Sequence, residues 1–374
     1  MLIRLAGPAD NERILAFQAR HAMRGKLPLR FDRSPDYFAL HRCHADFHEV
    51  WLAEDECGAI KGVASLVMRD GYIGGRVRRI AYLGDLRLVP DRHLSRAWTG
   101  VVRERLEALR REQGVEHAFC CMIRDNRIAV QSLARSRRPD RLGFAPWQGY
   151  DNVSIYARWG LSGNAQARAG VRIVEAQPHH ADALRAFLDA QSREQAFGCV
   201  FSQPEFERRL TTWPDFGLAS FLLAIDARGA VVGCVAPWDA GRIKRIVLEH
   251  LPPSLQAVRL AVNALAPILR RPRIAAPGES LGDVYLTHLQ VRDRDPAVFG
   301  ALLDAAWSRV RLTHALMQLC LYDNDPLWAA MEGFRYTRTP MDLYTLPIHA
   351  EQTQCHIGDV VFEGRLPGFE IYLV

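Results

Sequence analysis

Residues 82–109 read YLGDLRLVPDRHLSRAWTGVVRERLEAL, and this stretch decides the fold that we expect for the chain. An apolar run ends at Pro90, a short polar turn follows, and apolar side chains then recur at helical spacing up to Leu106 and Leu109. The pattern predicts a long strand, a turn and an amphipathic helix. The first N–H groups of such a helix lack partners and carry partial positive charge, which suits a phosphate. The alternative is an ordinary helix start with Ser95 as its N-cap.

Size and composition are those of a globular protein with two domains. The chain has 374 residues, of which 49% are hydrophobic and 24% charged. No apolar run is long enough to span a bilayer, and charges come too early for a secretory signal, so we expect a cytoplasmic protein without a membrane partner. The net charge of +6 permits acidic ligands such as nucleotides. The arginines are dispersed and no nucleic-acid motif accompanies them, so no nucleic-acid partner is expected.

Neither the cysteines nor the histidines predict a metal site. The eight cysteines include no C-x-x-C pair, which is typical of reduced and mostly buried thiols. The pair His179–His180 and the run HRCH at 41–44 lack a spaced partner cluster. We therefore expect no metal.

The sequence contains the same unit twice. Residues 50–64, VWLAEDECGAIKGVA, align without gaps with residues 221–235, FLLAIDARGAVVGCV, and each stretch predicts a β-hairpin with a D-x-x-G turn. The later landmarks keep the same order in both halves, with Asp85 opposite His288. We infer a tandem duplication.

The repeat sets the expected domain boundaries. The first domain covers residues 1–159, the linker GLSGNAQARAG covers 160–170, and the second domain covers 171–348. The second domain carries an insertion at 240–283, which contains an apolar helical run. Residues 349–374 have no counterpart in the first copy and are expected to add a closing hairpin or strand.

Each copy orders as strand, helix or helices, hairpin, long strand, helix, strand, helix and final strand. This order predicts an α/β (α+β) unit with a mixed, mostly antiparallel sheet flanked by helices. Together with the stretch 82–109, the strand HAFCCMI at 117–123 and the following DNRIAV and LGF, the unit resembles the GCN5-related N-acetyltransferase (GNAT) family. The resemblance covers nearly the whole chain as two copies. It implies an N-acetyltransferase that moves an acetyl group from acetyl-CoA directly to an amine on a small molecule or peptide.

The resemblance also implies where acetyl-CoA binds. The family pattern at the turn is Gln/Arg-x-x-Gly-x-Gly/Ala, and here Arg92, Ser95 and Ala97 fit it as R-x-x-S-x-A. A further asparagine, Asn126, either contacts the CoA arm or caps a helix. The implied cofactor-binding residues are Leu88, Val89, Arg92, His93, Leu94, Ser95, Arg96, Ala97 and Asn126.

The second copy is less suited to an anion at the same place. Its turn reads RDRDPAVFGALLDAAW at 292–307, where Asp293 and Asp295 repel a phosphate and Pro296 removes a donor. We therefore expect the first copy to bind acetyl-CoA, and the second to shape the acceptor pocket.

Two residues are candidates for acid–base chemistry. The resemblance implies Asp85, on the long strand, as the general base; the alternative is a structural carboxylate paired with Arg87 or with an arginine of the second copy. The corresponding His288 is a second catalytic candidate, with a buried core histidine as the alternative. The family's acid is often a tyrosine, and Leu133 takes that position here.

Other functions remain open on the sequence. The missing tyrosine fits a pseudoenzyme that binds CoA or a partner without turnover, and tandem copies also occur in mycothiol synthase-like and aminoacyl-transferring enzymes. The arginines at 135–141 form either a solvated loop or a contact to CoA or an acidic acceptor. Trp147 and Tyr150 line the acceptor cleft or cover the domain interface. A homodimer is also left open.

Overall fold

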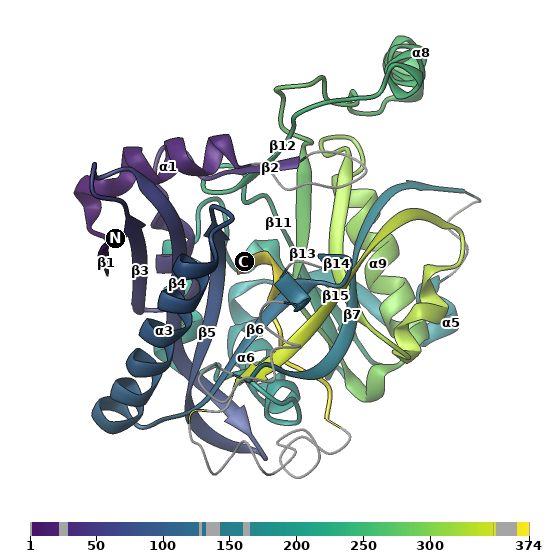
Figure 1. The fold of residues 1–374 in the computed structure, drawn as a ribbon. Coiled ribbons are helices and arrows are strands. Elements are labelled where there is room, and N and C mark those ends of the chain that lie inside the picture. Colours follow the sequence, from purple (N-terminus) through teal and green to yellow (C-terminus); the bar gives the residue numbers. More distant parts are fainter. Residues whose placement is uncertain are drawn as a thin grey trace.

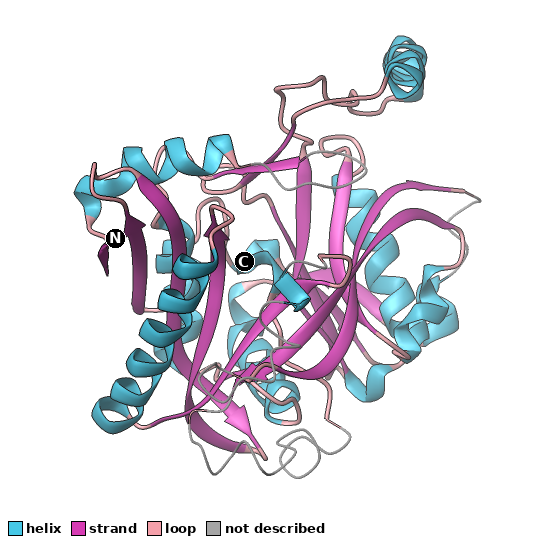
Figure 2. Ribbon diagram, viewed as in Figure 1, coloured by secondary structure: helices cyan, strands magenta, loops and turns pink. Residues whose placement is uncertain are grey.

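The computed structural model describes residues 2–21, 29–126, 129–131, 143–159, 165–346, 348 and 365–373. One twisted sheet runs through the molecule, with helices on its faces (Figure 1, Figure 2). In spatial order its strands are β1 (Leu2–Leu5), β3 (Phe47–Glu54), β4 (Ile60–Ile73), β5 (Arg76–Leu88), β6 (Val115–Ile123), β15 (Phe334–Leu346), β7 (Ala145–Arg158), β14 (Leu316–Tyr322), β13 (Asp283–Val291), β11 (Val231–Trp238), β10 (Leu222–Ile225) and β8 (Arg172–Glu175). The short β9 (Gly198–Cys199) pairs with β4.

The sheet is mixed and mostly antiparallel, as predicted. Within this strand order only β5 with β6 and β13 with β14 run parallel in the described part of the chain. A second sheet pairs β2 (Leu29–Asp32) with β12 (Arg245–Leu248). The helices are α1 (Asn11–Arg20), α2 (Ala39–His44), α3 (Arg92–Gln113), α5 (Ala165–Ala169), α6 (Ala181–Arg193), α7 (Gln203–Thr212), α8 (Pro253–Leu269) and α9 (Pro296–Val310). None of the helices in the described residues combines the length and apolar character that a bilayer crossing requires.

The two predicted hairpins are confirmed down to their turns. In the turn between β3 and β4, the Asp55 carboxylate accepts hydrogen bonds from the backbone N–H groups of Cys57 and Ala59, at 3.0 and 2.9 Å. In the turn between β10 and β11, Asp226 accepts from the N–H groups of residues 228 and 230, both at 2.9 Å. The glycine of each D-x-x-G turn has a positive φ, 76° at Gly58 and 82° at Gly229, which explains the shared glycine.

The corresponding long helices cover the sheet in each half. The predicted helix of the first copy is α3, whose Leu106 and Leu109 are fully buried against Ala81 and Ala118 of β5 and β6. Its counterpart α9 buries an apolar face against β10, β11 and β13. Both helices follow the parallel pair's first strand, so each half repeats the same strand–helix–strand crossover.

The last strand of each copy lies in the other copy's sheet. Strand β7, from the first copy, pairs with β14, and strand β15, from the second copy, pairs with β6. The two exchanged strands also pair with each other along twelve registered residue pairs, from Phe334–Arg158 to Thr345–Ala145. Sequence periodicity alone did not reveal this exchange, because each strand is compatible with either sheet.

The insertion and the C-terminal tail differ in where they lie relative to the body of the protein. Helix α8, inside the insertion, stands away from the body of the protein (Figure 1). Of the tail, residues 349–364 lie outside the described part. Residues 365–373 lie between the two halves, where they form one bridge, Ala196 to Pro367, and a 3₁₀ turn at Ile371–Leu373. Residues 160–164 of the expected linker also fall outside the described residues, and α5 forms part of the rest of that linker.

The strand exchange predicts that both halves unfold together. Leu343, on β15, is fully buried between Cys121 of β6 and Gln148 of β7. Leu343→Ala should lower the free energy of unfolding by about 2–5 kcal/mol through lost burial and a residual cavity. Urea unfolding followed by tryptophan fluorescence and by far-UV circular dichroism should give one coincident transition. Leu312→Ala, at a position 51% exposed, is the control and should stay within about 0.5 kcal/mol. Two separate unfolding transitions would contradict the prediction that the two halves unfold together.

Candidate functional site

The parallel strands β5 and β6 pair at one end and separate at the other. Their register runs from Arg79 with Val115 to Leu83 with Cys120. Beyond that point, within the part of the chain that the structure describes, β5 pairs only with β4, and β6 only with β15. Among the described residues, no backbone hydrogen bond joins 84–88 to 121–123. We call this region the first wedge; its facing strand edges offer N–H and C=O groups to a ligand.

A β-bulge begins each wedge. On β5 the register with β4 shifts between Val63–Arg87 and Ser65–Gly84, and Asp85 takes a φ of 55°. On β13 the register with β11 shifts at the corresponding place, and His288 takes a φ of 51°. Aspartate and histidine are among the few non-glycine residues that tolerate this conformation. The structure thus brings the predicted pair to the same position in both copies, where a bulge re-aims the side chain.

The Asp85 carboxylate is surrounded by donors from the first copy. Arg33 binds both of its oxygens, at 2.7 and 2.8 Å, and His41 Nε2 lies 2.9 Å from Oδ2. The hydroxyl groups of Tyr37 and Ser65 donate to Oδ2 at 3.3 and 3.2 Å. The arginine partner is therefore Arg33, and not Arg87 or a residue of the second copy as expected from sequence.

These contacts make Asp85 a weak base. Burial alone would raise the pKa of the Asp85 carboxyl, but the charge of Arg33 and the hydrogen bond from His41 hold the pKa well below its usual value. A carboxylate with so low a pKa has little affinity for the proton of an amine. The geometry therefore favours the structural alternative, in which Asp85 and the buried Arg33 fix the bulge. Its role as general base stays a prediction.

The start of α3 differs from the sequence expectation. The helix begins at Arg92, and its N-cap is Asp91 and not Ser95. The Asp91 carboxylate accepts from the N–H groups of His93 and Leu94, at 2.7 and 3.2 Å. The start of α9 is capped in the same way by Asp295. The expectation that only the first copy keeps free donors at its helix start is therefore wrong, since a carboxylate caps both.

The predicted cofactor residues fall into two groups around this helix start. The side chain of Leu94 is 1% exposed and packs with Leu88 in an apolar cluster, so these two contribute to the core. Val89 donates its N–H to the Lys61 carbonyl at 2.8 Å. His93, Arg96 and Ala97 are exposed in the first turn, and Ser95 is half-buried beside them. The exposed members are those that a ligand reaches without moving the core.

Asn126 acts as a helix cap. Its Oδ1 accepts from the Ala129 N–H at 3.2 Å, which favours the second of the two roles left open for it. Leu133 and the arginines at 135–141 lie outside the described residues. Trp147 packs edge-on against Phe197 of the second copy, at 5.1 Å between ring centroids, and Tyr150 is fully buried beside Phe369. Both aromatic side chains cover the junction between the copies.

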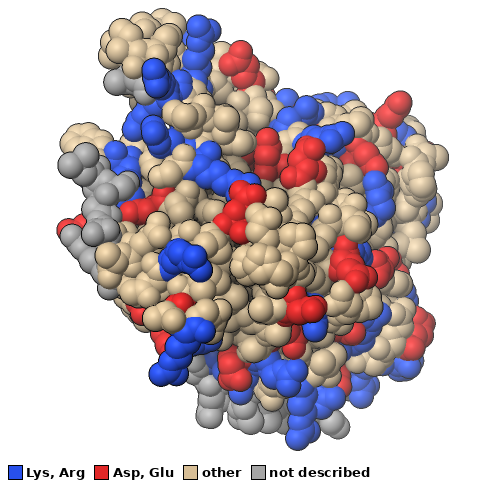
Figure 3. Space-filling view, turned by 180° about the vertical axis from the view of Figure 1, so that it is seen from behind, with Lys and Arg blue, Asp and Glu red and all other residues tan. Residues whose placement is uncertain are grey.

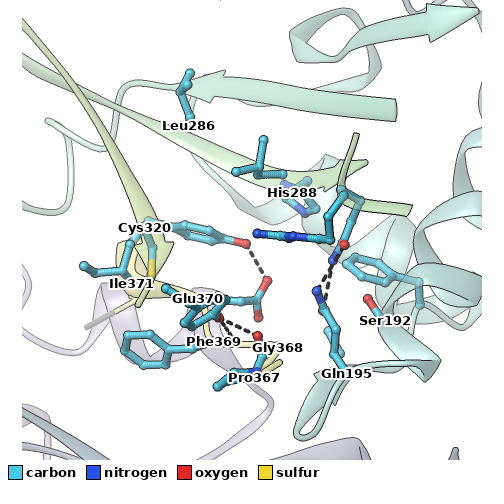
Figure 4. Close-up of a pocket in the computed structure, with 17 residues that line it drawn as sticks. Ser192, Gln195, Leu286, His288, Cys320, Pro367, Gly368, Phe369, Glu370 and Ile371 are labelled. Carbon is cyan, nitrogen blue, oxygen red and sulfur yellow. Dashed lines mark hydrogen bonds between the residues drawn. The ribbon is translucent and has the colours of Figure 1, made fainter. Parts of the chain in front are cut away.

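The second wedge, between β13 and β14, contains the C-terminal segment. The two strands pair only from Asp283–Leu316 to Tyr285–Gln318 and then separate. Figure 4 shows the pocket there, with Leu286 and His288 from β13 on one side and Pro367 to Ile371 on the other. The Tyr322 hydroxyl donates to the Pro367 carbonyl, and the Phe369 N–H donates to Tyr322 at 3.3 Å.

A buried arginine anchors this segment. Arg209, on α7, is fully buried and binds both oxygens of Glu370. It also pairs with Glu205 at 2.7 Å and lies 3.1 Å from His288 Nε2. Burial, then the positive charge of Arg209, lower the pKa of His288 to about 3. His288 is therefore neutral at physiological pH, with its Nε2 lone pair directed at Arg209, and the contacts favour the alternative of a buried core histidine; its catalytic role stays a prediction.

Several residues around the wedges were missed by the sequence reasoning. Arg33 and Tyr37 lie in the segment between α1 and β3, and His41 belongs to the HRCH run that was weighed only for a metal. Lys244, inside the insertion, is buried over the rings of Phe31 and Tyr285. No local motif marks these residues, since each reaches its partner through the tertiary fold. Among the described residues, no group of three or more histidine, cysteine or acidic side chains is placed to hold a metal.

Comparison with solved structures identifies the fold. No family model matches the chain, and no curated protein matches its sequence. Yeast (Saccharomyces cerevisiae) N-myristoyltransferase with bound myristoyl-CoA superposes with a TM-score of 0.58 at 12% identity, covering 92% of this chain and 83% of that one. A GCN5-related N-acetyltransferase from Sphaerobacter thermophilus gives 0.51 at 12% identity, covering 93% and 96%. The chain has a tandem GNAT fold.

A third neighbour extends the comparison to a larger protein. The GCN5-related glucosamine N-acetyltransferase region of a fungal multi-domain β-N-acetylglucosaminidase gives a TM-score of 0.56 at 11% identity, covering 92% of this chain and 38% of that one. The likeness to all three spans both copies of the repeat. At these identities the comparison establishes the tandem GNAT fold and leaves the chemistry to the site.

The neutral, buried histidines predict a pH dependence of stability. The pKa of His288 and that of His44 are each lowered to about 3, mainly by burial, from about 6.5 in the unfolded chain. Between these values the unfolded state binds more protons, so stability is present above pH 6.5 and is lost as the pH falls towards 3. Each histidine contributes a slope of at most about 1.4 kcal/mol per pH unit.

His288→Gln should therefore flatten this slope between pH 6.5 and 4.5, because glutamine can accept from Arg209 without binding a proton. The measurement is urea unfolding at several pH values. Leu312→Ala, at an exposed position without a titratable group, is the control and should keep the wild-type slope. An unchanged slope in His288→Gln would show that His288 is protonated in the folded protein.

Proposed function

We propose that the chain is an acyl-CoA-dependent N-acyltransferase, in which the first copy holds the acyl-CoA and the second copy shapes the acceptor pocket. The observation that carries the proposal is the first wedge, where two parallel strands separate next to a bulge and a helix start. The pantetheine arm of CoA is a chain of amide groups, and unpaired strand edges can bind such a chain as an added strand would bind. The tandem GNAT fold supports this assignment.

The difference between the two wedges supports the proposal that the first copy holds the acyl-CoA and the second shapes the acceptor pocket. The second wedge is filled by residues 367–373, which the Arg209–Glu370 ion pair and the Tyr322 hydrogen bonds tie down. The first wedge has no such strap among the described residues, although Phe369 comes within 6.0 Å of the Tyr82 ring, by centroids. We therefore assign the CoA arm to the first wedge.

The reaction that we propose is direct transfer in a ternary complex. A neutral amine attacks the thioester carbonyl, a C–N bond forms and the C–S bond breaks. CoA leaves as the thiolate, which takes up the proton that the nitrogen loses, so the products are the amide and the CoA thiol. Backbone N–H groups along the first wedge would donate to the carbonyl oxygen as negative charge develops on it. Asp85 and Arg33 act here as positioning residues, because their pairing fixes the strand on which those donors lie.

The length of the acyl group that the protein accepts is to be determined by experiment. The sequence resemblance implies acetyl-CoA, whereas the yeast neighbour is an N-myristoyltransferase with bound myristoyl-CoA. Calorimetric titration with CoA, acetyl-CoA and myristoyl-CoA tests binding, and release of the CoA thiol in the presence of an amine panel tests turnover. Binding without thiol release from any thioester would identify a CoA-binding pseudoenzyme. Absence of binding to all three ligands would overturn the proposal.

The capped helix starts predict an increase in affinity on mutation. Asp91 occupies two N–H donors at the start of α3 and places a negative charge beside them. If the CoA pyrophosphate binds there, Asp91→Ala should tighten CoA binding about three- to tenfold, because it frees the donors and removes the repulsion. The loss of the N-cap should cost about 1 kcal/mol of stability, which thermal unfolding measures.

Asp295→Ala is the matched control, because Asp295 caps α9 through two N–H groups in the same way. It should lower stability similarly and leave the dissociation constant of CoA unchanged. Tighter binding in Asp295→Ala with no change in Asp91→Ala would move the CoA site to the second copy. No change in either variant would place the pyrophosphate away from both helix starts.

A further inference from the structure

Among the described residues, helix α8 makes few contacts with any other helix or strand. It spans Pro253–Leu269 and stands apart from the sheet and from the helices that cover it (Figure 1). Its large apolar side chains are exposed to solvent to an unusual extent. The exposed fractions are 42% for Leu255, 55% for Val258, 57% for Leu260, 38% for Val262, 52% for Leu265 and 78% for Ile268.

The polar side of α8 faces its own return segment. Gln256, Arg259 and Asn263 lie on one face, at spacings of three and four residues. Asn263 binds the chain that leads back to the body: its Nδ2 donates to the Ile274 carbonyl at 3.0 Å, and its Oδ1 accepts from the Ile274 N–H at 2.8 Å. A helix on the surface of a water-soluble protein shows the opposite orientation, with its apolar side inward. The broad apolar face of α8 is therefore presented outward.

The charge around α8 has a single sign. No acidic residue occurs between Glu249 and Glu279, whereas arginines stand at 259, 270, 271 and 273. Within the described residues, no ion pair neutralises the three exposed arginines that follow the helix, Arg270, Arg271 and Arg273. Figure 3 shows the helix as an almost uncharged projection with basic side chains beneath it.

We propose that α8 docks the protein on an anionic phospholipid bilayer, lying along the surface with its apolar side chains among the acyl chains and its arginines at the headgroups. Its 17 residues measure about 26 Å, which is shorter than the roughly 30 Å hydrocarbon core, and Pro267 interrupts its last turn. A basic, one-sided apolar helix of this kind binds in the interface and does not span. The proposal replaces the sequence-based expectation of no membrane partner, and it does not depend on the proposed function.

A second copy of the chain is the competing occupant. Two α8 helices could bury their apolar faces against each other. Such a pair leaves the arginines that follow each helix without negative partners, whereas phosphate headgroups neutralise them. The lack of any acidic residue along the helix therefore favours the lipid surface over a copy of the same helix.

The test is flotation of the intact protein with vesicles of phosphatidylcholine alone or with 30% phosphatidylglycerol. The wild type should float with the anionic vesicles and bind the neutral ones at least tenfold more weakly. Val258→Glu with Leu265→Glu should reduce the partition coefficient on anionic vesicles at least tenfold. Changing Arg270, Arg271 and Arg273 to Gln should remove most of the preference for anionic lipid. Leu312→Glu, at another exposed apolar position, is the matched control and should bind like the wild type.

Thermal unfolding checks that all variants keep the wild-type fold, as expected for changes at exposed positions. Light scattering coupled to gel filtration measures the oligomeric state and so tests whether a second copy of the chain covers α8. Failure of the wild type to bind anionic vesicles would overturn the proposal, as would unchanged binding by the Val258→Glu/Leu265→Glu variant. A wild-type dimer that this variant converts to a monomer, without vesicle binding, would assign α8 to a second copy.

Discussion

Strand β6 has a hydrogen-bond partner along its outer edge only because β15, from the other copy, lies beside it, and β14 depends on β7 in the same way. An unpaired edge in the middle of the molecule would leave backbone N–H and C=O groups buried without partners. Neither copy therefore completes its sheet alone. The exchange also fixes the two wedges relative to each other, since both flank the same central pair of strands, β7 and β15. Any chemistry shared between the copies depends on this coupling.

The duplicated backbone carries different side chains at its most constrained point. Both bulges force a positive φ on a residue with a Cβ, which costs about 1–3 kcal/mol, and both are stabilised through a buried arginine. In the first copy Arg33 meets the charged Asp85; in the second copy Arg209 meets neutral His288 and takes its counter-charges from Glu205 and Glu370. The C-terminal segment thus supplies in the second copy the charge that the strand itself supplies in the first.

Local patterns in the sequence were enough for much of the fold. The D-x-x-G turns, the strand ending near Pro90 and the amphipathic α3 each depend on residues close in sequence, and the repeat doubled the evidence for them. The equivalence of Asp85 and His288 in the two copies was also predictable, because it follows from aligning the two halves of the sequence. The strand exchange was not, since β7 and β15 have the same alternation whichever sheet they join.

The site was less predictable for two physical reasons. Arg33 reaches Asp85 across 52 residues and Arg209 reaches Glu370 across 161, and no spacing rule encodes contacts of that range. The prediction of the N-cap of α3 was wrong for a local reason. Asp91 and Ser95 are both good N-cap residues, and the choice between them depends on where the chain leaves β5. The result removes the electrostatic contrast between the two turns, because an aspartate caps each of them. In the proposed reaction the difference between the copies must then come from the wedges.

Displacing the C-terminal segment from the second wedge would carry a large cost in free energy. Emptying it would separate Glu370 from the buried Arg209 and expose Ile371, Tyr372 and Leu373. Breaking a buried ion pair costs about 3–5 kcal/mol, and the pairing that remains with Glu205 puts the loss nearer the lower figure. Burial of three large apolar side chains adds about 1.5–3 kcal/mol for each one that becomes fully exposed. A ligand with a dissociation constant of about 1 μM gains about 8 kcal/mol, most of which would be lost in opening this wedge. For the function proposed above, the cost of displacing the C-terminal segment favours the first wedge as the CoA site, without any difference between the two helix starts.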